Sequence, residues 1–551
     1  MAKEHQVIKN RPSKRRKLES APKPVKEGSH EEVLRFEVTN LLASRLSLKP
    51  NEESATKDDR AEKNEDAPLP EPFTELELDI VELSSTGDAL AIAPSGNHVY
   101  VVPFSVPGDR VLAKALRPVH NQSYSHADFL KVIRPSPKRE GVIPQCKYFS
   151  TCSGCQLQML PYEAQLEHKR TIVEKAFRNF SGLSSEQVPK VGKTMGSPLE
   201  YGYRTKLTPH FDGPPGKRNE RRFTQVPKIG FAQKGRRYVM DIEVCPIATD
   251  IVQEGLRIER ANVAKNLSKY RNGATILLRE STQRIPKEQD GDSAPISVDQ
   301  PVPTSKELTH DPDTGAPQLK LTYPAYTDIK TYTSNNDSTA TEYISKHTFT
   351  SRAGSFFQNN NSILTPFITY VRDNCIPAAP ILDPKNPDPP IKYLLDAYCG
   401  SGLFTIALSG LFSSALGIDI DAAGVASART NAEKNNIPNA GFIAADASDL
   451  FADVPYPPDQ SLVVIDPPRK GASEDFLRQL CAFGPKRVVY VSCNVHTQAR
   501  DVGMLVDGFG PGPAEKWKYE IESLRGLDFF PQTGHVEGIC FLNRVPAARL
   551  A

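Results

Sequence analysis

The chain has 551 residues, too many for one hydrophobic core, so we expect roughly two to four domains. Hydrophobic residues make up 38 % of the chain, and no apolar run reaches about 18 residues, which excludes a membrane-spanning segment. The formal net charge is only +2, so any binding to nucleic acid has to come from local basic patches.

The first 70 residues are rich in Lys, Glu, Asp, Ser and Pro and are expected to be a disordered tail, with one short helix at 35–48. The basic cluster at 14–17 (KRRK) is typical of a nuclear-localisation or RNA-contacting segment, and equally of a solvated tail. The start, MAKEHQVIKN, lacks the apolar core of a secretory signal, so the protein is expected inside the cell. Glu4 and Glu19 favour the nucleus over the mitochondrion, and the cytosol stays open.

Residues 71–138 contain short β-type runs broken by Gly and Pro, which predicts a small barrel similar to the OB fold at 75–134. Closed barrels of this size commonly bind oligonucleotides. Residues 139–350 predict a mixed α+β central domain with a helix from Tyr162 to Phe180. Two polar, Pro-rich segments, 281–318 and 377–390, are expected to be insertions, and the first of them disordered.

Residues 351–551 form the last predicted domain, and from about 391 they alternate strand-like and helix-like runs. This rhythm predicts an α/β, doubly wound Rossmann-like sheet whose ligands bind at the carboxyl ends of its strands.

A nucleoside site is predicted where LDAYCGSG (395–402) follows a strand and opens a helix. The next strand ends at Asp419, a carboxylate suited to two ribose hydroxyls, and Asp446 ends the third strand, within reach of an adenine. Position 405 is Thr rather than the third Gly of a dinucleotide site, which favours S-adenosylmethionine over NAD. Helix N-caps are the alternative interpretation of both aspartates.

Two further strand ends carry candidate chemistry. Asp466 opens DPPR after the fourth strand, where an ordinary turn is the alternative. Cys493, in SCN (492–494), ends the fifth strand and is a candidate nucleophile. Glu537 lies just before the last strand and could act as its base, and His535 competes for that role on spacing alone.

Five motifs follow one another along the chain: FFQNN (356–360), LDAYCGSG (395–402), DPPRKG (466–471), SCN (492–494) and FPQTGHVE (530–537). With them the chain resembles the RNA uracil-C5 methyltransferases, and most closely the fungal members that act on the T-loop of tRNA. The resemblance covers residue 72 to the end, apart from the two insertions. It implies that the barrel is a TRAM domain, an RNA-binding module.

The resemblance also implies a mechanism and a set of ligand contacts. Cys493 would add to C6 of uracil, C5 would take the methyl group of S-adenosylmethionine, and Glu537 would remove the C5 proton. Gln358, Tyr398 and Asp419 match positions that contact the cofactor in the family, and Asp466 matches a carboxylate near it. The target base inside a folded T-arm would have to be extruded.

Three alternatives stay open at this point. The protein could be a non-catalytic tRNA-folding or RNA-binding protein, its target could be rRNA rather than tRNA, or its target could be a cytosine. We expect a monomer with no membrane partner.

Four cysteines in the central domain form a second candidate site, with a tight triplet and a distant fourth member: Cys146, Cys152, Cys155 and Cys245. Four thiolates suit Zn²⁺, but zinc modules typically use two close pairs, and some family members carry a [4Fe–4S] cluster at this spacing. We therefore expect a structural [4Fe–4S] cluster, with zinc as the alternative.

Overall fold

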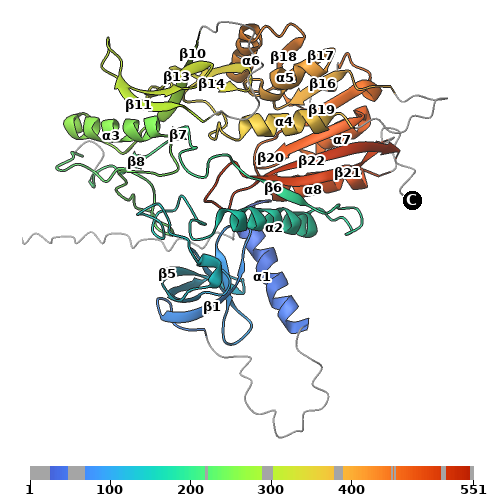
Figure 1. The fold of residues 1–551 in the computed structure, drawn as a ribbon. Helices are drawn as coiled ribbons and strands as arrows, with labels where there is room; N and C mark the ends of the chain where they lie inside the picture. The colour runs from blue at the N-terminus through green and yellow to red at the C-terminus, as the bar shows by residue number, and fades with distance from the viewer. Residues whose placement is uncertain are drawn as a thin grey trace, which may run out of the picture.

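The computed structural model describes residues 25–47, 69–216, 221–287, 302–377, 389–447, 451, 454–510 and 517–546. The basic cluster at 14–17 and residues 378–388 of the second insertion lie outside these ranges. Figure 1 shows a small barrel and a long helix at one end of the molecule, and the larger sheets with their helices at the other. Within the described ranges, no helix has the length and apolar character needed to cross a bilayer.

The barrel predicted at 75–134 is present and closed, in the order β1-β2-β3-β5-β4. Its strands are β1 (Glu75–Leu83), β2 (Ala89–Ile92), β3 (Val99–Val102), β4 (Arg110–Pro118) and β5 (Tyr124–Arg134). Small side chains such as Ala89 and Ala113 fill its interior beside Val111, because a five-stranded barrel leaves little internal space.

Helix α1 (His30–Ser47) begins earlier than the helix predicted at 35–48 and packs against the outside of the barrel. Leu34 and Val38 are buried against Val99 and Val101 of β3. The N-terminal helix is therefore fixed to the barrel by apolar contacts.

The middle of the chain forms a five-stranded sheet in the order β11-β12-β13-β10-β7, with α3 (Asp250–Lys265) packed against it. Helix α2 has the predicted bounds, Tyr162–Phe180. The strands and hairpins of this region are β7 (Lys206–Leu207), β8 (His210–Phe211), β9 (Ala274–Thr275), β10 (Leu278–Pro286), β11 (Ser305–His310), β12 (Pro317–Thr322), β13 (Tyr326–Thr333), β14 (Thr339–Ile344) and β15 (His347–Arg352).

The prediction of a disordered insertion over 281–318 is wrong at both of its ends. Most of β10, all of β11 and the start of β12 lie inside that range. β10 pairs along its length with β13, so backbone pairing orders a segment whose polar side chains resemble those of a loop.

The C-terminal sheet has eight strands in the order β18-β17-β16-β19-β20-β22-β21-β6. The first five are parallel, and β22 runs antiparallel to both of its neighbours. The strands are β6 (Gly192–Met195), β16 (Tyr393–Ala397), β17 (Ser414–Asp419), β18 (Ala440–Ala444), β19 (Ser461–Ile465), β20 (Arg487–Ser492), β21 (Trp517–Leu527) and β22 (Glu537–Pro546). β6 comes from the predicted central domain, so the sheet extends beyond the predicted boundary at residue 351.

Helices cover both faces of this sheet. On one face lie α2, α7 (Glu474–Phe483) and α8 (Val495–Asp507), and on the other α4 (Leu364–Cys375), α5 (Leu403–Leu408) and α6 (Ala422–Lys434). Alternate residues of β20 reach the two cores: Tyr490 enters the first and Val491 the second. β19 and β20 are buried throughout, as continuous apolar strands between two helical layers should be.

Candidate active site

Cys493 and Glu537 lie opposite each other where two neighbouring strands meet. β20 ends at Ser492, whose Cα pairs with that of Gly538 in the antiparallel strand β22. Cys493 follows Ser492 and Glu537 precedes Gly538, so the same register sets the thiol and the carboxylate across from each other. Glu537 is buried and Cys493 is partly exposed.

Asp466 joins this pair at the end of β19, one residue beyond Ile465. The pKa of the Cys493 thiol is raised to about 12, mainly by burial and then by the negative charges of Glu537 and Asp466. Burial raises the pKa of Glu537 to about 7. Burial and the charge of Glu537 raise the pKa of Asp466 well above its ordinary value. The site thus holds three acidic groups whose charges influence one another.

Arg469 is the cation that opposes this effect. Its side chain hydrogen-bonds Cys493, and both that bond and its positive charge lower the pKa of the thiol. The same charge lowers the pKa of Glu537. Arg469 stands in the DPPRKG motif, but sequence reasoning gave it no role because the contact with Cys493 depends on the fold.

The structure separates the two candidate bases. The pKa of His535 is lowered to about 4 by burial and by nearby cations, first among them Arg469. The pKa of Glu537 is about 7, so its carboxylate is the stronger proton acceptor near neutral pH. Of these two residues, only Glu537 shifts the pKa of Cys493 through its charge.

The predicted nucleoside site is a tight turn between β16 and α5. Tyr398, Gly400 and Gly402 all have positive φ values, of 66°, 52° and 89°. Asp419 accepts a hydrogen bond from the Gly400 amide at 2.9 Å and thereby fixes the turn. The N-cap of α6 is Asp421, so the alternative interpretation of Asp419 as a helix cap is wrong.

A second carboxylate, Asp396, supports this turn and was missed by sequence reasoning. It is fully buried and accepts hydrogen bonds from the backbone amide and the hydroxyl of Thr405, at 2.9 and 2.5 Å. Its Oδ1 has no hydrogen-bond partner. The sequence shows that Asp396 belongs to the LDAYCGSG motif, but it does not show that the side chain is buried.

Of the other predicted cofactor residues, Asp446 lies at the same end of the sheet as this turn. Asp446 is exposed just after β18, and after burial its charge is the next cause that raises the pKa of Tyr398 to about 12. Gln358 is partly exposed in the loop between β15 and α4. That loop is tied to the segment before Glu537, because the Asn360 amide donates to the Phe529 carbonyl at 3.2 Å.

Cys493 opens into a cavity of about 700 Å³. The cavity is lined by residues of the N-terminal segment, the barrel, the DPPRKG turn, the segment after β20 and the segment before β22. They include Lys26, His30, Thr86, Arg469, Asn494 and His535. A space of this size accommodates a nucleotide-sized ligand next to the thiol.

Comparison with known proteins identifies the family. The chain is 41 % identical over 538 residues to the tRNA (uracil(54)-C(5))-methyltransferase of Schizosaccharomyces pombe, an alignment that covers 97 % of this chain and 86 % of the relative. The enzyme of the same name from Saccharomyces cerevisiae is 36 % identical, with 97 % and 84 % covered. A family model described as tRNA (Uracil-5-)-methyltransferase matches residues 341–454.

The chain belongs to the tRNA (uracil-5-)-methyltransferase family.

A solved structure agrees with this family at the level of the fold. The Pyrococcus abyssi tRNA (uracil-54, C5)-methyltransferase, in complex with S-adenosyl-L-homocysteine, superposes with a TM-score of 0.55. The two chains are 22 % identical, and the match covers 85 % of this chain and 100 % of the archaeal one.

The four-cysteine site of this family member is not arranged as predicted. Cys146, Cys152, Cys155 and Cys245 lie within electrostatic range, and burial and neighbouring thiols raise the pKa of Cys155 and Cys245 to about 12. Among the residues that the structure describes, no group of three or more His, Cys, Asp or Glu side chains is placed to hold a metal ion. The predicted ligand set is therefore not supported by this geometry.

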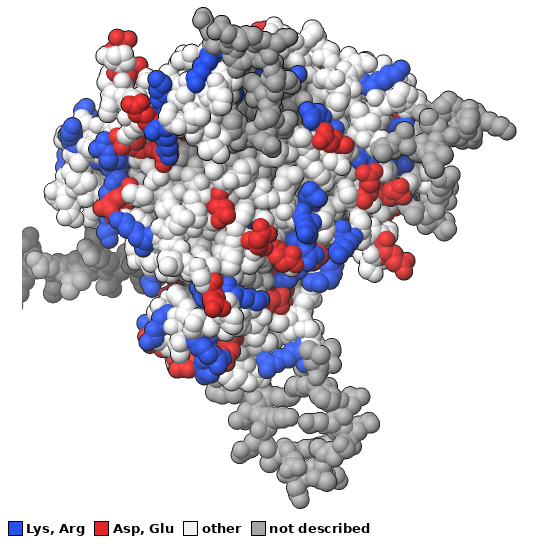
Figure 2. Space-filling view, viewed as in Figure 1, with Lys and Arg blue, Asp and Glu red and all other residues white. Residues whose placement is uncertain are grey.

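Several basic residues of the central region are engaged in contacts within the protein. Lys234 pairs with Asp88 at 2.8 Å and Arg236 with Asp128 at 3.1 Å. Lys206 donates to the carbonyl of Ser355 at 2.9 Å. Figure 2 shows basic and acidic side chains interspersed on the visible face, without one continuous basic patch.

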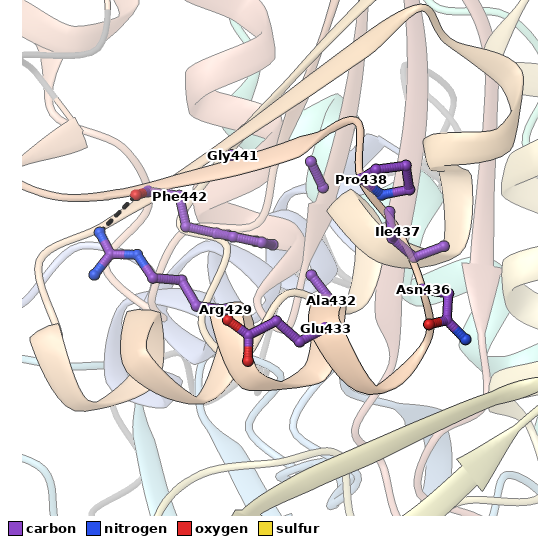
Figure 3. Close-up of a pocket in the computed structure, with 9 residues that line it drawn as sticks. Arg429, Ala432, Glu433, Asn436, Ile437, Pro438, Gly441 and Phe442 are labelled. Carbon is purple, nitrogen blue, oxygen red and sulfur yellow. Dashed lines mark hydrogen bonds between the residues drawn. The ribbon is translucent and has the colours of Figure 1, made fainter.

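A second cavity, of about 550 Å³, lies at the outer edge of the sheet between α6 and β18. In Figure 3 the Arg429 guanidinium reaches the Phe442 carbonyl across one side of it, at 2.7 Å. None of the predicted site residues lines this cavity, so it is separate from the catalytic pair.

Proposed function

We propose that this protein transfers a methyl group from S-adenosylmethionine to C5 of the T-loop uridine of tRNA. The observation that carries the proposal is the opposition of a partly exposed thiol and a buried carboxylate across β20 and β22. Relatives that are 41 % and 36 % identical over nearly the whole chain are named for this reaction, which favours tRNA over rRNA as the substrate.

Cys493 begins the reaction. Its thiol gives up a proton to solvent, and the positive charge and hydrogen bond of Arg469 stabilise the resulting thiolate. The sulfur then bonds to C6 of the uracil, and the electron pair of the C5=C6 bond moves toward C5. Uracil C5 is a poor nucleophile, and this transient covalent bond activates it. When bound, S-adenosylmethionine supplies the methyl group that C5 takes.

Glu537 completes the reaction. Its carboxylate removes the proton from C5, the C5=C6 double bond forms again, and the C6–sulfur bond breaks to release Cys493. A base with a pKa of about 7 is suited to this step near neutral pH.

The cofactor would be held at the β16–α5 turn. Tyr398, Gly400 and Gly402 bend the backbone there, and Asp419 and Asp446 stand at the neighbouring strand ends. The unpartnered Oδ1 of the buried Asp396 is consistent with a polar ligand at this turn. The sheet order reverses direction at β16, where doubly wound Rossmann-like sheets bind their ligands.

The experiment is incubation with labelled S-adenosylmethionine and an unmodified tRNA transcript, followed by mapping of 5-methyluridine. Cys493→Ala should abolish product, whereas Cys481→Ala, at a buried thiol in α7, should not. Glu537→Gln should accumulate a denaturant-stable protein–RNA complex, because methylated uracil cannot lose its C5 proton.

Four outcomes would overturn the proposal. A Cys493→Ala variant that methylates at the normal rate would exclude covalent catalysis. Methylation of an rRNA transcript in preference to tRNA would reassign the substrate, and methylated cytosine would reassign the base. Binding of tRNA without any methylation would leave a non-catalytic RNA-folding protein.

The five-stranded barrel is proposed to act as a TRAM-type RNA-binding module, supported by its closure and its place beside the catalytic cavity. Ser85 and Thr86, in the turn between β1 and β2, line that cavity. Nuclear localisation and a monomeric state stay predictions.

The [4Fe–4S] cluster also stays a prediction. Its support is the gathering of Cys146, Cys152, Cys155 and Cys245, and the geometry described above stands against it. An anaerobic preparation that is brown and contains iron and sulfide would establish the cluster, and a colourless protein with stoichiometric zinc would establish the alternative.

A further inference from the structure

The segment Lys26–His30, which ends at the first residue of α1, forms part of the wall of the Cys493 cavity. All five residues of this N-terminal strap line the cavity together with Arg469 and Cys493. The strap is separated from Cys493 by more than 460 residues of chain, as shown by the Gly28–Asn494 contact, which spans 466 positions.

Helix α1, which follows the strap, anchors it to the rest of the protein. The Glu37 carboxylate is buried and accepts a hydrogen bond from the Ser85 amide of the barrel at 2.9 Å. Lys175 of α2 lies 3.7 Å from the same carboxylate. Phe36 packs edge-on against Phe180 with ring centroids 4.8 Å apart. These contacts fix the helix to the barrel and to the large C-terminal sheet with its helices.

The strap itself touches the catalytic turn. Asn494, the residue after Cys493, donates from Nδ2 to the carbonyl of Gly28 at 3.1 Å and to that of Arg469 at 3.0 Å. One amide therefore joins the strap to the DPPRKG turn. Glu27 forms an ion pair with Arg500 of α8.

Gly28 is required for this close approach. Its φ is +64°, and a Cβ there would come within 2.5 Å of Thr497 Cγ2 and 2.7 Å of Asn494 Nδ2. A side chain at this position would push the strap away from the catalytic turn.

His30 is one of the residues that line the cavity. Its side chain is exposed, and its ring centroid lies 6.3 Å from that of His535. Enough protein surrounds the ring that burial is the largest cause of its lowered pKa, so the imidazole is neutral at physiological pH. A neutral, accessible ring is a surface on which a nucleobase can stack.

The charges of the cavity suit a polyanion. Lys26, Arg469 and Lys470 line it, and the carboxylate of Glu27 in the same wall is already paired with Arg500. The wall that the strap completes therefore carries a surplus of positive charge, which attracts phosphates.

We propose that the strap is part of the RNA-binding site, in which His30 stacks on a base at or next to the target uridine and Gly28 holds the strap against the catalytic turn. The inference rests on the proposed methylation of tRNA and adds a substrate-contacting element from the far end of the chain.

The first test is a pair of variants at His30 in the full-length protein. His30→Ala should lower kcat/KM for tRNA about 10-fold, the size expected for loss of one base–aromatic stack, with KM for S-adenosylmethionine unchanged. His30→Phe keeps a ring and should stay near wild type. In a Cys493→Ala background, His30→Ala should weaken tRNA binding by a similar factor, which reports on the contact without the chemistry.

The second test is Gly28→Ala, with Gly315→Ala as the matched control. Gly315, in the β11–β12 turn, has a φ of +68°, but a Cβ added there would meet nothing within 4 Å, so the control reproduces the backbone strain without the clash. Gly28→Ala should lower kcat/KM for tRNA, and Gly315→Ala should not.

The outcomes separate this inference from the proposed function. If the wild-type protein methylates tRNA and neither His30→Ala nor Gly28→Ala changes kcat/KM or tRNA binding, the strap is not part of the RNA site. Faster turnover by either variant would show that the strap obstructs the cavity and would also overturn the proposal. If the wild-type protein methylates no tRNA, the proposed function fails instead, and the binding measurement in the Cys493→Ala background still tests the strap.

Discussion

At the scale of single residues, opposing charges around the Cys493 sulfur determine how readily its thiol loses a proton. Burial, Glu537 and Asp466 all favour the neutral thiol of Cys493, and Arg469 favours the thiolate. A thiol with a pKa of about 12 is largely protonated at neutral pH, so the proposed nucleophile depends on the positive charge of Arg469. The positive charge of Arg469 also lowers the pKa of Glu537, so Arg469 influences both of the proposed reacting groups.

The pH dependence of the step that releases Cys493 from the methylated base should follow Glu537. Its pKa is raised to about 7, and only the ionised form accepts the C5 proton, so the rate should rise as the pH rises through about 7. A pH–rate profile under single-turnover conditions measures this directly. A rate that stays flat from pH 6 to about 8 would exclude Glu537 as the base.

Replacement of Arg469 should disturb both groups at once. Arg469→Ala removes a charge that lowers the pKa of Cys493 and of Glu537, so the rising limb of the profile should move to higher pH. The rate at neutral pH should fall by about 100-fold, as for loss of one preorganised electrostatic contact. Arg478→Ala, at an exposed arginine on α7, is the control and should leave the profile unchanged.

At the scale of elements, the catalytic strand end is supported by close packing of α8 on α2. A Cβ on Gly503 of α8 would come within 1.9 Å of the Ser181 carbonyl oxygen at the end of α2. The helices can approach this closely only where one of them carries no side chain. Since α8 begins two residues after Cys493, the position of this helix also sets that of the proposed nucleophile.

Gly503→Ala should therefore destabilise the fold. Forcing a methyl group against backbone costs about 1–3 kcal/mol, which urea unfolding monitored by circular dichroism can measure. Gly410→Ala is the matched substitution, because Gly410 lies in a short helical turn where an added Cβ would meet nothing within 4 Å. Equal unfolding midpoints for the two variants would contradict the packing argument.

At the scale of the whole molecule, the C-terminal active-site loop is fixed by residues from much earlier in the chain. Lys169 of α2 and Asp528 of the segment before Glu537 form a fully buried ion pair at 2.5 Å. Lys169 also donates to the Phe530 carbonyl at 3.0 Å. The helix from the predicted central region thereby anchors the segment that carries the proposed base.

Lys169→Met should be strongly destabilising. It leaves the Asp528 carboxylate buried without its partner, which typically costs about 3–5 kcal/mol. Lys147→Met removes the lysine of an exposed pair with Glu243 and should change the unfolding midpoint little. A Lys169→Met variant as stable as Lys147→Met would show that the buried pair does not hold the loop.

Sequence reasoning identified the elements whose signals are local. The bounds of α2, the closed barrel at 75–134 and the parallel strands of the last domain all follow from hydrophobic periodicity and turn residues. It failed where pairing partners are distant. β10 and β11 have polar side chains and resemble a loop until β12 and β13 are placed beside them. β6 could not be assigned to the large sheet, because its neighbour β21 lies more than 300 residues later.

The amino-acid sequence is sufficient to place Cys493, Asp466 and Asp419 at strand ends, because strand and turn signals depend on neighbouring residues. Which of these groups meet depends on the packing of the folded chain. The register of β20 against β22 sets Glu537 opposite Cys493, and burial separates Glu537 from His535 as a base. The tertiary structure also brings Arg469 to the Cys493 thiol and places the N-terminal strap in the wall of the same cavity. Such contacts depend on packing between segments that are not neighbours in the sequence, so no local pattern encodes them.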